Sequence, residues 1–249
     1  MRRLQQTLRN YLRPRRHSAL LIVIATAFLV RPLLGESRSA QIIFSIAMVL
    51  LMLTALYTTQ VDELVGEREL LLIQRRRRRI MAWILAVPAI AERLYAIAFP
   101  GHRVFVATSL CWLLFFGFVT WILLRSVLKH KEVTSETIAM SMSVYLLLAV
   151  TWGMLYLLIF AFQPNAFSLG SAPPSTPDVP PDRQNVIPIF VYFSLTTLST
   201  IGFGDILPVS LQARYAAVAE GITGQFYLAI LVARLVGMQM SSQQHTPPR

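Results

Sequence analysis

Six long apolar segments, separated by polar or charged stretches, dominate the hydrophobic pattern of the chain. A helix that crosses a bilayer needs about 20 predominantly apolar residues, and each segment comes close to that length. The pattern therefore predicts six membrane-spanning helices, at about 18–34, 40–59, 80–97, 104–124, 137–162 and 209–238.

The ends of the first two spans carry further signals. Pro32 is expected to end the first helix, and apolar residues beyond position 59 predict that the second helix continues past the membrane. The first segment, with its basic start, also fits a signal peptide that has Ser37 and Ser39 at its cleavage site. The orientation of the remaining spans would be the same in either case.

Composition supports a membrane protein. Hydrophobic residues make up 55% of the 249 positions and charged residues only 14%, which leaves no room for a sizeable soluble domain. The single cysteine, Cys111, lies in an apolar segment and excludes an intrachain disulfide. We therefore expect an all-α membrane protein.

The net charge of +11 raises the question of a nucleic-acid partner, but the placement of the basic residues indicates membrane topology instead. If the apolar segments alternate in direction, most of the basic residues fall on one side, which the positive-inside rule makes cytoplasmic. Both termini are then cytoplasmic, in a multi-pass protein of the cell (inner) membrane. The arginine run can act as a topology anchor or bind anionic lipid; it consists of Arg75, Arg76, Arg77, Arg78 and Arg79.

A glycine-containing segment, FSLTTLSTIGFGD from Phe193 to Asp205, stands between two long apolar segments. Gly202 and Gly204 permit backbone angles that a side chain would forbid. A backbone that alternates between two such conformations can turn successive carbonyl oxygens the same way. Four copies around an axis would stack rings of carbonyl oxygens, with a ring of Thr200 hydroxyls below, and such rings can replace the water shell of a cation.

The sequence TIGFGD, from Thr200 to Asp205, resembles the selectivity-filter signature of potassium channels. Ile201 and Phe203 depart from the commonest residues of that signature, and the family accepts both. The resemblance implies a homotetramer that conducts K⁺ passively, with no cofactor besides the permeant ions. It implies that K⁺ binds the carbonyl oxygens of Thr200, Ile201, Gly202 and Phe203 and the Thr200 hydroxyl, with Gly204 completing the filter.

The segment GQFYLAILVARLVG, which begins at Gly224, further resembles the inner helices of small bacterial six-span potassium channels without a voltage sensor. The fourth span carries no basic residue before Arg125. Because each charge that crosses the membrane field contributes about 2.3 kcal/mol per 100 mV, such a helix cannot supply steep voltage dependence. The resemblance is good over 137–238 and only topological over 18–124.

These features divide the chain into five expected parts. A basic cytoplasmic N-terminus (1–17) precedes a four-helix, voltage-sensor-like domain without gating arginines (18–124). A linker (125–136) leads to the pore domain (137–238), and a short cytoplasmic tail follows (239–249). Within the pore domain, Ile187 to Ser199 is expected to form the pore helix. The loop from Gln163 to Pro188, with seven of the fourteen prolines, is expected to lack a regular helix or strand.

Five residues are candidates for filter support. The resemblance places Asp205 at the outer mouth, where it can bond the pore-helix region or act as a surface charge. It places Tyr192 and Phe193 in an aromatic cuff behind the filter, where they can equally be ordinary core aromatics. Thr196 stands where channels of this family often have a filter-bracing carboxylate. Glu220, a carboxylate inside the last span, can brace the filter from behind, place a charge in the cavity or serve a purely structural role. It can be protonated, or it can hydrogen-bond Ser or Thr hydroxyls behind the filter. A carboxylate in low dielectric resists ionisation unless it is paired.

The last span also carries the candidates for gating and cavity lining. Gly224 falls on the hinge-glycine position of the family's inner helix, and Gly221 is a second candidate; close helix packing is the alternative for both. Cavity-lining candidates follow at helical spacing, namely Gln225, Leu228 and Val232. His102 and Glu220 are the candidates for pH sensing.

Two other functions remain open from the sequence. A weakly selective cation channel is one, although such channels usually lose the aromatic at position 203. A non-conducting membrane sensor or regulatory subunit is the other. The chain has no HExxH motif, no nucleophile elbow and no cluster of intramembrane His or Asp, so we do not expect an enzyme.

Overall fold

The computed structural model describes residues 16–34, 38–64, 80–84, 86–88, 90–91, 105–129, 134–169 and 186–244. Its elements are α2 (Arg16–Leu34), α3 (Arg38–Leu64), α5 (Phe105–Lys129), α6 (Ser135–Phe162), η1 (Pro164–Ala166), β1 (Phe167–Ser168), α7 (Val186–Leu198), β2 (Leu207–Pro208) and α8 (Leu211–Gln244). The described residues between 80 and 91 are also helical. The expected all-α class is therefore confirmed.

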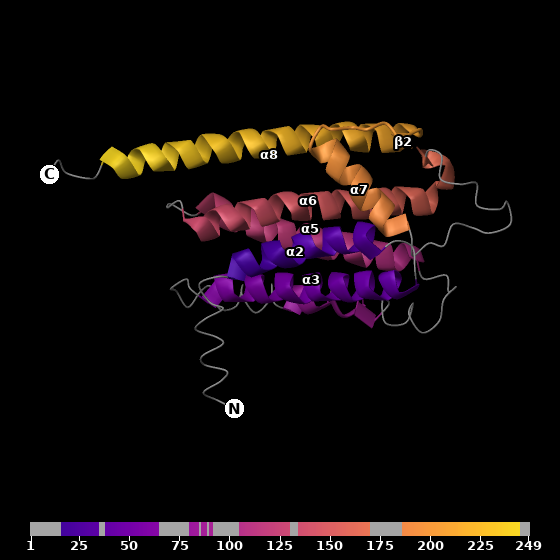
Figure 1. Ribbon diagram of the computed structural model, residues 1–249, viewed down its shortest axis with the longest axis horizontal. Coiled ribbons are helices and arrows are strands. Elements are labelled where there is room, and N and C mark those ends of the chain that lie inside the picture. Colours follow the sequence, from indigo (N-terminus) through magenta and orange to yellow (C-terminus); the bar gives the residue numbers. More distant parts are fainter. Residues whose placement is uncertain are drawn as a thin grey trace, which may run out of the picture.

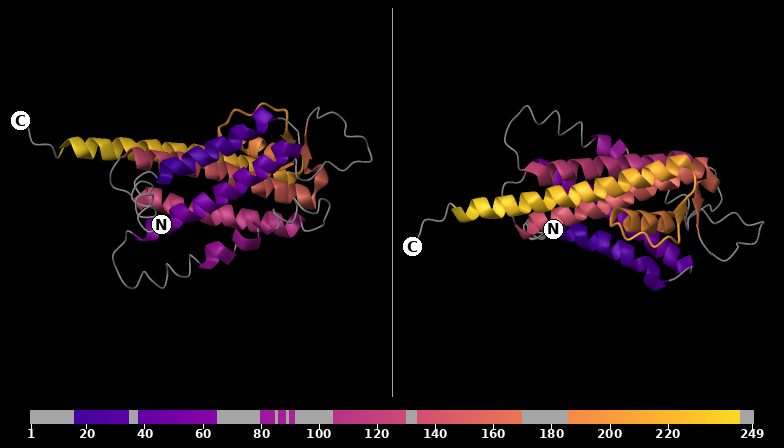
Figure 2. Two further views of the ribbon diagram at one scale, coloured as in Figure 1. Left: turned by 60° about the horizontal axis from the view of Figure 1, so that its bottom comes forward. Right: turned by 90° about the horizontal axis from the view of Figure 1, so that it is seen from above.

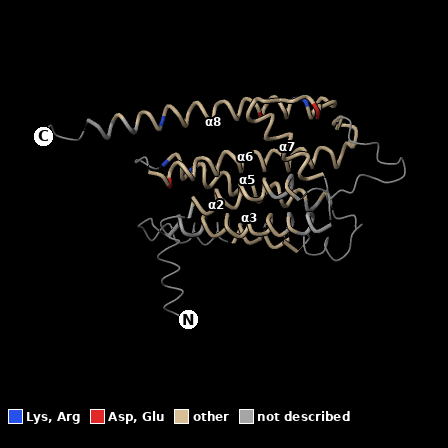
Figure 3. The backbone as a smooth tube through the Cα atoms, in the orientation of Figure 1, with Lys and Arg blue, Asp and Glu red and all other residues tan. Residues whose placement is uncertain are grey.

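The helices follow the predicted apolar segments closely. α3 continues to Leu64, as its apolar residues predict, whereas α2 passes through Pro32 to Leu34. Within the described part of the chain, three helical segments are long and apolar enough to cross a membrane: Ser109–Lys129, Ser135–Phe162 and Leu211–Gly237. Shorter apolar helices cover His17–Leu29, Ile46–Thr58 and Val186–Leu198. Charged residues are sparse along the described helices (Figure 3).

One prediction about the loop after α6 was wrong. The segment from Gln163 to Pro188 was expected to have no regular helix or strand, but it begins with η1 and β1. β1 pairs antiparallel with β2, Phe167 opposite Pro208 and Ser168 opposite Leu207. The physical reason is tertiary: the Ala166 carbonyl accepts N–H bonds from Val209 and Ser210, at 2.8 and 3.2 Å. Residues 170–185 lie outside the described part.

The helices form a bundle with the pore-helix candidate α7 set obliquely in it. α2, α3, α5 and α6 run roughly along one direction, and α7 crosses between α6 and α8 (Figure 1). Views from two other sides show the long α8 beside α6, with its far end projecting beyond the bundle (Figure 2). α6 contacts α2, α5, α7 and α8, so it is the central helix of the bundle.

A buried core of aromatic and aliphatic side chains holds α7 against α6. Phe190 on α7 is fully buried, and its ring packs edge-on against Phe167 with centroids 4.9 Å apart. Gly153 of α6 lets the two backbones approach, because an added Cβ would lie 3.1 Å from the Val191 Cα. Burial of such side chains stabilises the fold by roughly 2–3 kcal/mol each. The position of α7, and with it the segment from 199 to 205, is therefore set by α6.

Glu136, in the first turn of α6, ties the start of α2 to the bundle. Its carboxylate accepts the backbone N–H of His17 at 3.1 Å and the Ser18 hydroxyl at 2.5 Å. The first backbone N–H groups of a helix have no partner within the helix, and the positive end of its dipole favours an anion. Glu136 therefore caps α2, although it lies more than a hundred positions further along the chain.

We expect Glu136→Ala to lower the free energy of unfolding by about 1–3 kcal/mol, because the N–H and hydroxyl that Glu136 binds would lose their partner. Thermal unfolding of the purified protein in detergent micelles measures the effect. Thr26→Val is the matched control, since the Thr26 hydroxyl bonds only the Ile22 carbonyl of its own helix. Equal melting temperatures for the Glu136 variant and the control would contradict the capping role.

Candidate functional site

The backbone of the TIGFGD segment has an alternating conformation. Thr200, Gly202 and Gly204 have positive φ angles of 59°, 52° and 78°, and the residues between them do not. A backbone in which every second residue takes the left-handed conformation can turn successive carbonyl oxygens to one side. This geometry suits the coordination of a file of dehydrated cations.

The positive φ angle of Thr200 was not predicted from the sequence. Glycine adopts positive φ readily, but a β-branched residue there is unusual and costs on the order of 1–3 kcal/mol. Three backbone bonds at the end of α7 hold the turn: the Thr200 N–H donates to Thr197, and the N–H groups of Ile201 and Gly202 donate to the Thr196 carbonyl at 2.9 and 3.1 Å. The pore helix therefore fixes the start of the segment.

The Asp205 end of the segment is joined to α7 by Tyr192. Its hydroxyl donates to Asp205 at 2.8 Å, and its ring stacks on Phe203 with centroids 6.4 Å apart and planes 4° from parallel. The Asp205 carboxylate also accepts the Ile206 N–H. The structure thus brings together Tyr192, Phe203 and Asp205. A bond from Asp205 to the pore-helix region was one of the two expectations for that residue, whereas the stacking of Tyr192 on Phe203 was not predicted.

If the TIGFGD segment forms the ion filter that its sequence predicts, we expect Tyr192→Phe to make ion flux decline faster during a sustained recording. The substitution removes the hydrogen bond to Asp205 and keeps the ring that stacks on Phe203, so the Asp205 end of the segment loses one restraint. Electrical recording from planar bilayers measures the decline. Tyr57→Phe, which alters an exposed tyrosine of α3, is the control; an unchanged time course in Tyr192→Phe would contradict the role of this bond.

Phe193 and Thr196 are buried in the interior of the chain. The Phe193 ring packs edge-on against Tyr156 and Phe167, with centroids 4.9 and 5.7 Å away. The Thr196 hydroxyl bonds the Phe193 carbonyl of its own helix, whereas the Thr196 carbonyl oxygen accepts the N–H bonds of Ile201 and Gly202. Phe193 is thus a core aromatic that supports α7 from behind.

Glu220 is completely buried between three helices. Tyr156 of α6 donates its hydroxyl to the Glu220 carboxyl group at 2.5 Å, and Ser194 of α7 contacts the other carboxyl oxygen. The Ser194 hydroxyl also lies 2.7 Å from the Ala149 carbonyl oxygen. Sequence reasoning found Glu220 and allowed Ser or Thr hydroxyls as its partners, but it named neither Tyr156 nor Ser194, because these partners come from other helices.

The inner-helix candidates fall into two environments. An added Cβ at Gly224 would overlap the Leu198 carbonyl oxygen and lie 2.9 Å from the Leu198 Cδ1 atom, whereas one at Gly221 would meet nothing within 4 Å. The three cavity-lining candidates are exposed along α8 in a single chain: Gln225, Leu228 and Val232. Arg75–Arg79 and His102 lie outside the described residues.

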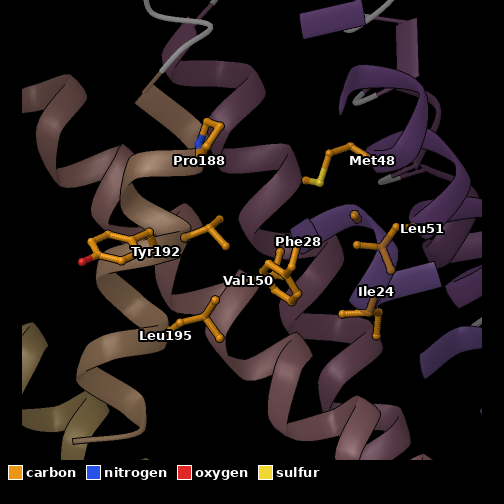
Figure 4. A pocket seen from close by; sticks show the side chains of 10 residues that line it. Ile24, Phe28, Met48, Leu51, Val150, Pro188, Tyr192 and Leu195 are labelled. Carbon is orange, nitrogen blue, oxygen red and sulfur yellow. The ribbon is translucent and has the colours of Figure 1, made fainter. Parts of the chain in front are cut away.

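An apolar pocket of about 290 Å³ lies behind the pore helix. α7 supplies Pro188, Tyr192 and Leu195 on one side, and α2 and α3 supply Ile24, Phe28 and Leu51 on the other (Figure 4). The Tyr192 hydroxyl points away from this pocket toward Asp205. The first helices therefore approach the pore helix through side chains without charge.

The family of the chain follows from comparison with known proteins. A family whose description is "Ion channel" matches residues 108–240, more than half of the chain. This range holds α6, α7, the TIGFGD segment and most of α8. The chain therefore belongs to this pore-domain family of ion channels and is a membrane protein.

Several curated relatives resemble the same region. Protein LctB of Bacillus caldotenax is 29% identical over 92 residues, which cover 37% of this chain and 64% of LctB. The voltage-gated potassium channel Kch of Escherichia coli is 32% identical over 123 residues, 49% of this chain and 25% of Kch. Potassium channel protein kcv of Paramecium bursaria Chlorella virus 1 is 31% identical over 77 residues, 31% of this chain and 77% of kcv.

The chain thus spans less than two thirds of LctB and a quarter of Kch. No solved structure matches the chain significantly.

Proposed function

We propose that the protein is a potassium-selective channel that conducts K⁺ passively through a filter formed by Thr200 to Asp205 of four chains. The observation that carries this proposal is the alternation of positive φ at Thr200, Gly202 and Gly204 within a TIGFGD sequence. Two relatives whose names describe potassium channels support it. In this proposal, K⁺ binds the carbonyl oxygens of residues 200–203 and the Thr200 hydroxyl.

A homotetramer follows from the need for a ring of filter strands, because one chain supplies one strand and soluble and membrane oligomers favour closed symmetry. The inner helix supports this assembly. Only 17% of the residues in the most apolar stretch of α8 are buried within a single chain, against 44% for α6. Tyr215, Ile222 and Phe226 are exposed on it. In the tetramer, some exposed side chains would contact neighbouring subunits, and Gln225, Leu228 and Val232 would line the cavity.

We propose that opening does not depend steeply on voltage. α5 carries no basic residue before Arg125, and the Arg125 guanidinium lies 4.4 Å from the centre of the Trp121 ring near the end of the helix. A charge there crosses little of the membrane field. The same proposal places both termini in the cytoplasm, with the five-part organisation given above, and assigns the arginine run to the inner leaflet, where anionic lipid can bind.

Flux from liposomes tests the function. Purified full-length protein is reconstituted, loaded with K⁺ and diluted into Na⁺, with a proton ionophore and a pH-sensitive dye to report K⁺ efflux. We expect efflux that barium blocks and that external K⁺, but not Na⁺, suppresses. Efflux that Na⁺ suppresses equally would indicate a weakly selective cation channel. Absence of flux over a range of voltage, pH, lipid and tension would indicate a non-conducting subunit and overturn the proposal.

A further inference from the structure

If the carboxyl group of Glu220 were ionised, its network of buried hydrogen bonds would have one hydrogen fewer than it has contacts. Glu220 is fully buried on α8, and both of its hydrogen-bond partners are neutral hydroxyls, Tyr156 and Ser194. Burying an unpaired charge is costly, whereas a neutral polar group needs only hydrogen-bond partners. The distribution of protons among these contacts therefore defines the state of the carboxyl group.

Three contacts must each hold a hydrogen. Tyr156 contacts one carboxyl oxygen of Glu220, Ser194 contacts the other, and the Ser194 oxygen also lies 2.7 Å from the Ala149 carbonyl. The carbonyl can only accept, so the single Ser194 proton goes to Ala149. The contact between Ser194 and Glu220 then joins two oxygens with no hydrogen between them, unless Glu220 supplies it.

We propose that Glu220 is protonated and donates to Ser194, and that its proton positions the pore helix. The resulting chain of donors runs from Tyr156 to Glu220, from Glu220 to Ser194 and from Ser194 to Ala149. It joins α8 to α7, and both of them to α6, and every member is satisfied. This assignment rests on the proposed channel function only for its consequence, namely that the filter depends on the placement of α7.

The position of Ser194 gives the network its effect on the filter. Ser194 lies two residues before Thr196, whose carbonyl binds the N–H groups of Ile201 and Gly202. A shift of α7 at Ser194 is therefore transmitted through one helical turn to the start of the filter segment. Glu220 is a positioning residue in this scheme, since it contacts α6 and α7 and not the ion path.

Infrared spectroscopy tests the protonation directly. The spectrum of Glu220→Gln subtracted from that of the unaltered protein, both in lipid near neutral pH, should show the C=O stretching band of one protonated carboxyl group. A difference spectrum with only carboxylate bands would overturn the proposal. This measurement needs no ion flux, so its outcome is independent of the channel function.

The potassium flux of two Glu220 variants tests the positioning role. Glu220→Gln retains a donor and an acceptor in the same place, so we expect potassium flux within about twofold of the unaltered protein. Glu220→Ala leaves the buried Tyr156 and Ser194 hydroxyls without a partner, and we expect flux to fall on the order of tenfold. Unaltered flux in Glu220→Ala, or equal losses in both variants, would overturn the role.

A matched pair of serine variants separates the network from the loss of any buried hydroxyl. Ser194→Ala breaks the chain of donors, whereas Ser143→Ala removes an equally buried hydroxyl that bonds only the Ala139 carbonyl of its own helix. We expect the former to lower flux and the melting temperature, and the latter to change neither strongly. If the unaltered protein conducts no ions, melting temperatures still decide whether Glu220 positions α7. They are compared for the two serine variants and for Glu220→Gln and Glu220→Ala. Equal temperatures would overturn that role.

Discussion

On the proposed function, Gly202→Ala is expected to abolish potassium flux while leaving the proposed tetramer assembled. Gly202 has a φ of +52°, and no other atom would lie within 4 Å of a Cβ added there. The substitution therefore meets no steric obstacle in the chain and acts through the backbone alone. Alanine disfavours the left-handed conformation by about 1–2 kcal/mol, and a change of that conformation would turn a filter carbonyl away from the ion path.

Liposome flux and size-exclusion chromatography with cross-linking measure the two parts of this expectation. Gly237→Ala is the matched control, because Gly237 also has open space around its Cα atom and its φ is not positive. We expect full flux and normal assembly for the control. Normal flux in Gly202→Ala would exclude residues 200–205 as the filter, whereas loss of assembly would show that Gly202 serves the fold rather than conduction.

The local features of the fold could be predicted because they depend on neighbouring residues in the sequence. Apolar length alone placed the starts of α5, α6 and α8 and the end of α6 within two residues. The ends of α5 and α8, at Lys129 and Gln244, lie five and six residues beyond the predicted ones. Gly202 and Gly204 likewise indicated their own backbone conformation. The left-handed Thr200 could not be found in this way, because threonine disfavours that conformation and only the carbonyls at the end of α7 hold it there.

Features that depend on contacts between helices could be predicted from the sequence only in part. Glu220 stood out as a carboxylate in an apolar span, but its partners Tyr156 and Ser194 are 64 and 26 positions away. The pairing of β1 with β2 was missed for the same reason, since the proline-containing loop carries no local strand signal. The filter sequence itself is recognisable from six residues, whereas the supports of the filter are a property of the packed bundle.

Gly224→Ala is expected to lower the free energy of unfolding by about 1–3 kcal/mol, the usual cost of overpacking a closely packed site. The added Cβ would overlap the Leu198 carbonyl oxygen, which already accepts a hydrogen bond from Tyr145 at 3.2 Å. That oxygen cannot move away without breaking this bond and displacing the end of α7. The close approach of α8 to the pore helix therefore requires glycine at 224, whether or not the helix also bends there.

Gly221→Ala is the control that separates packing from bending. It lies three residues away on α8 with nothing within 4 Å of an added Cβ, and alanine favours a helix interior over glycine by roughly 0.5–1 kcal/mol. We expect this variant to melt at an equal or higher temperature, and Gly224→Ala at a lower one. If both variants keep their stability and only Gly224→Ala loses channel opening in bilayer recordings, Gly224 is a hinge. If Gly224→Ala unfolds more easily, as we expect, its flux falls because the pore helix is displaced.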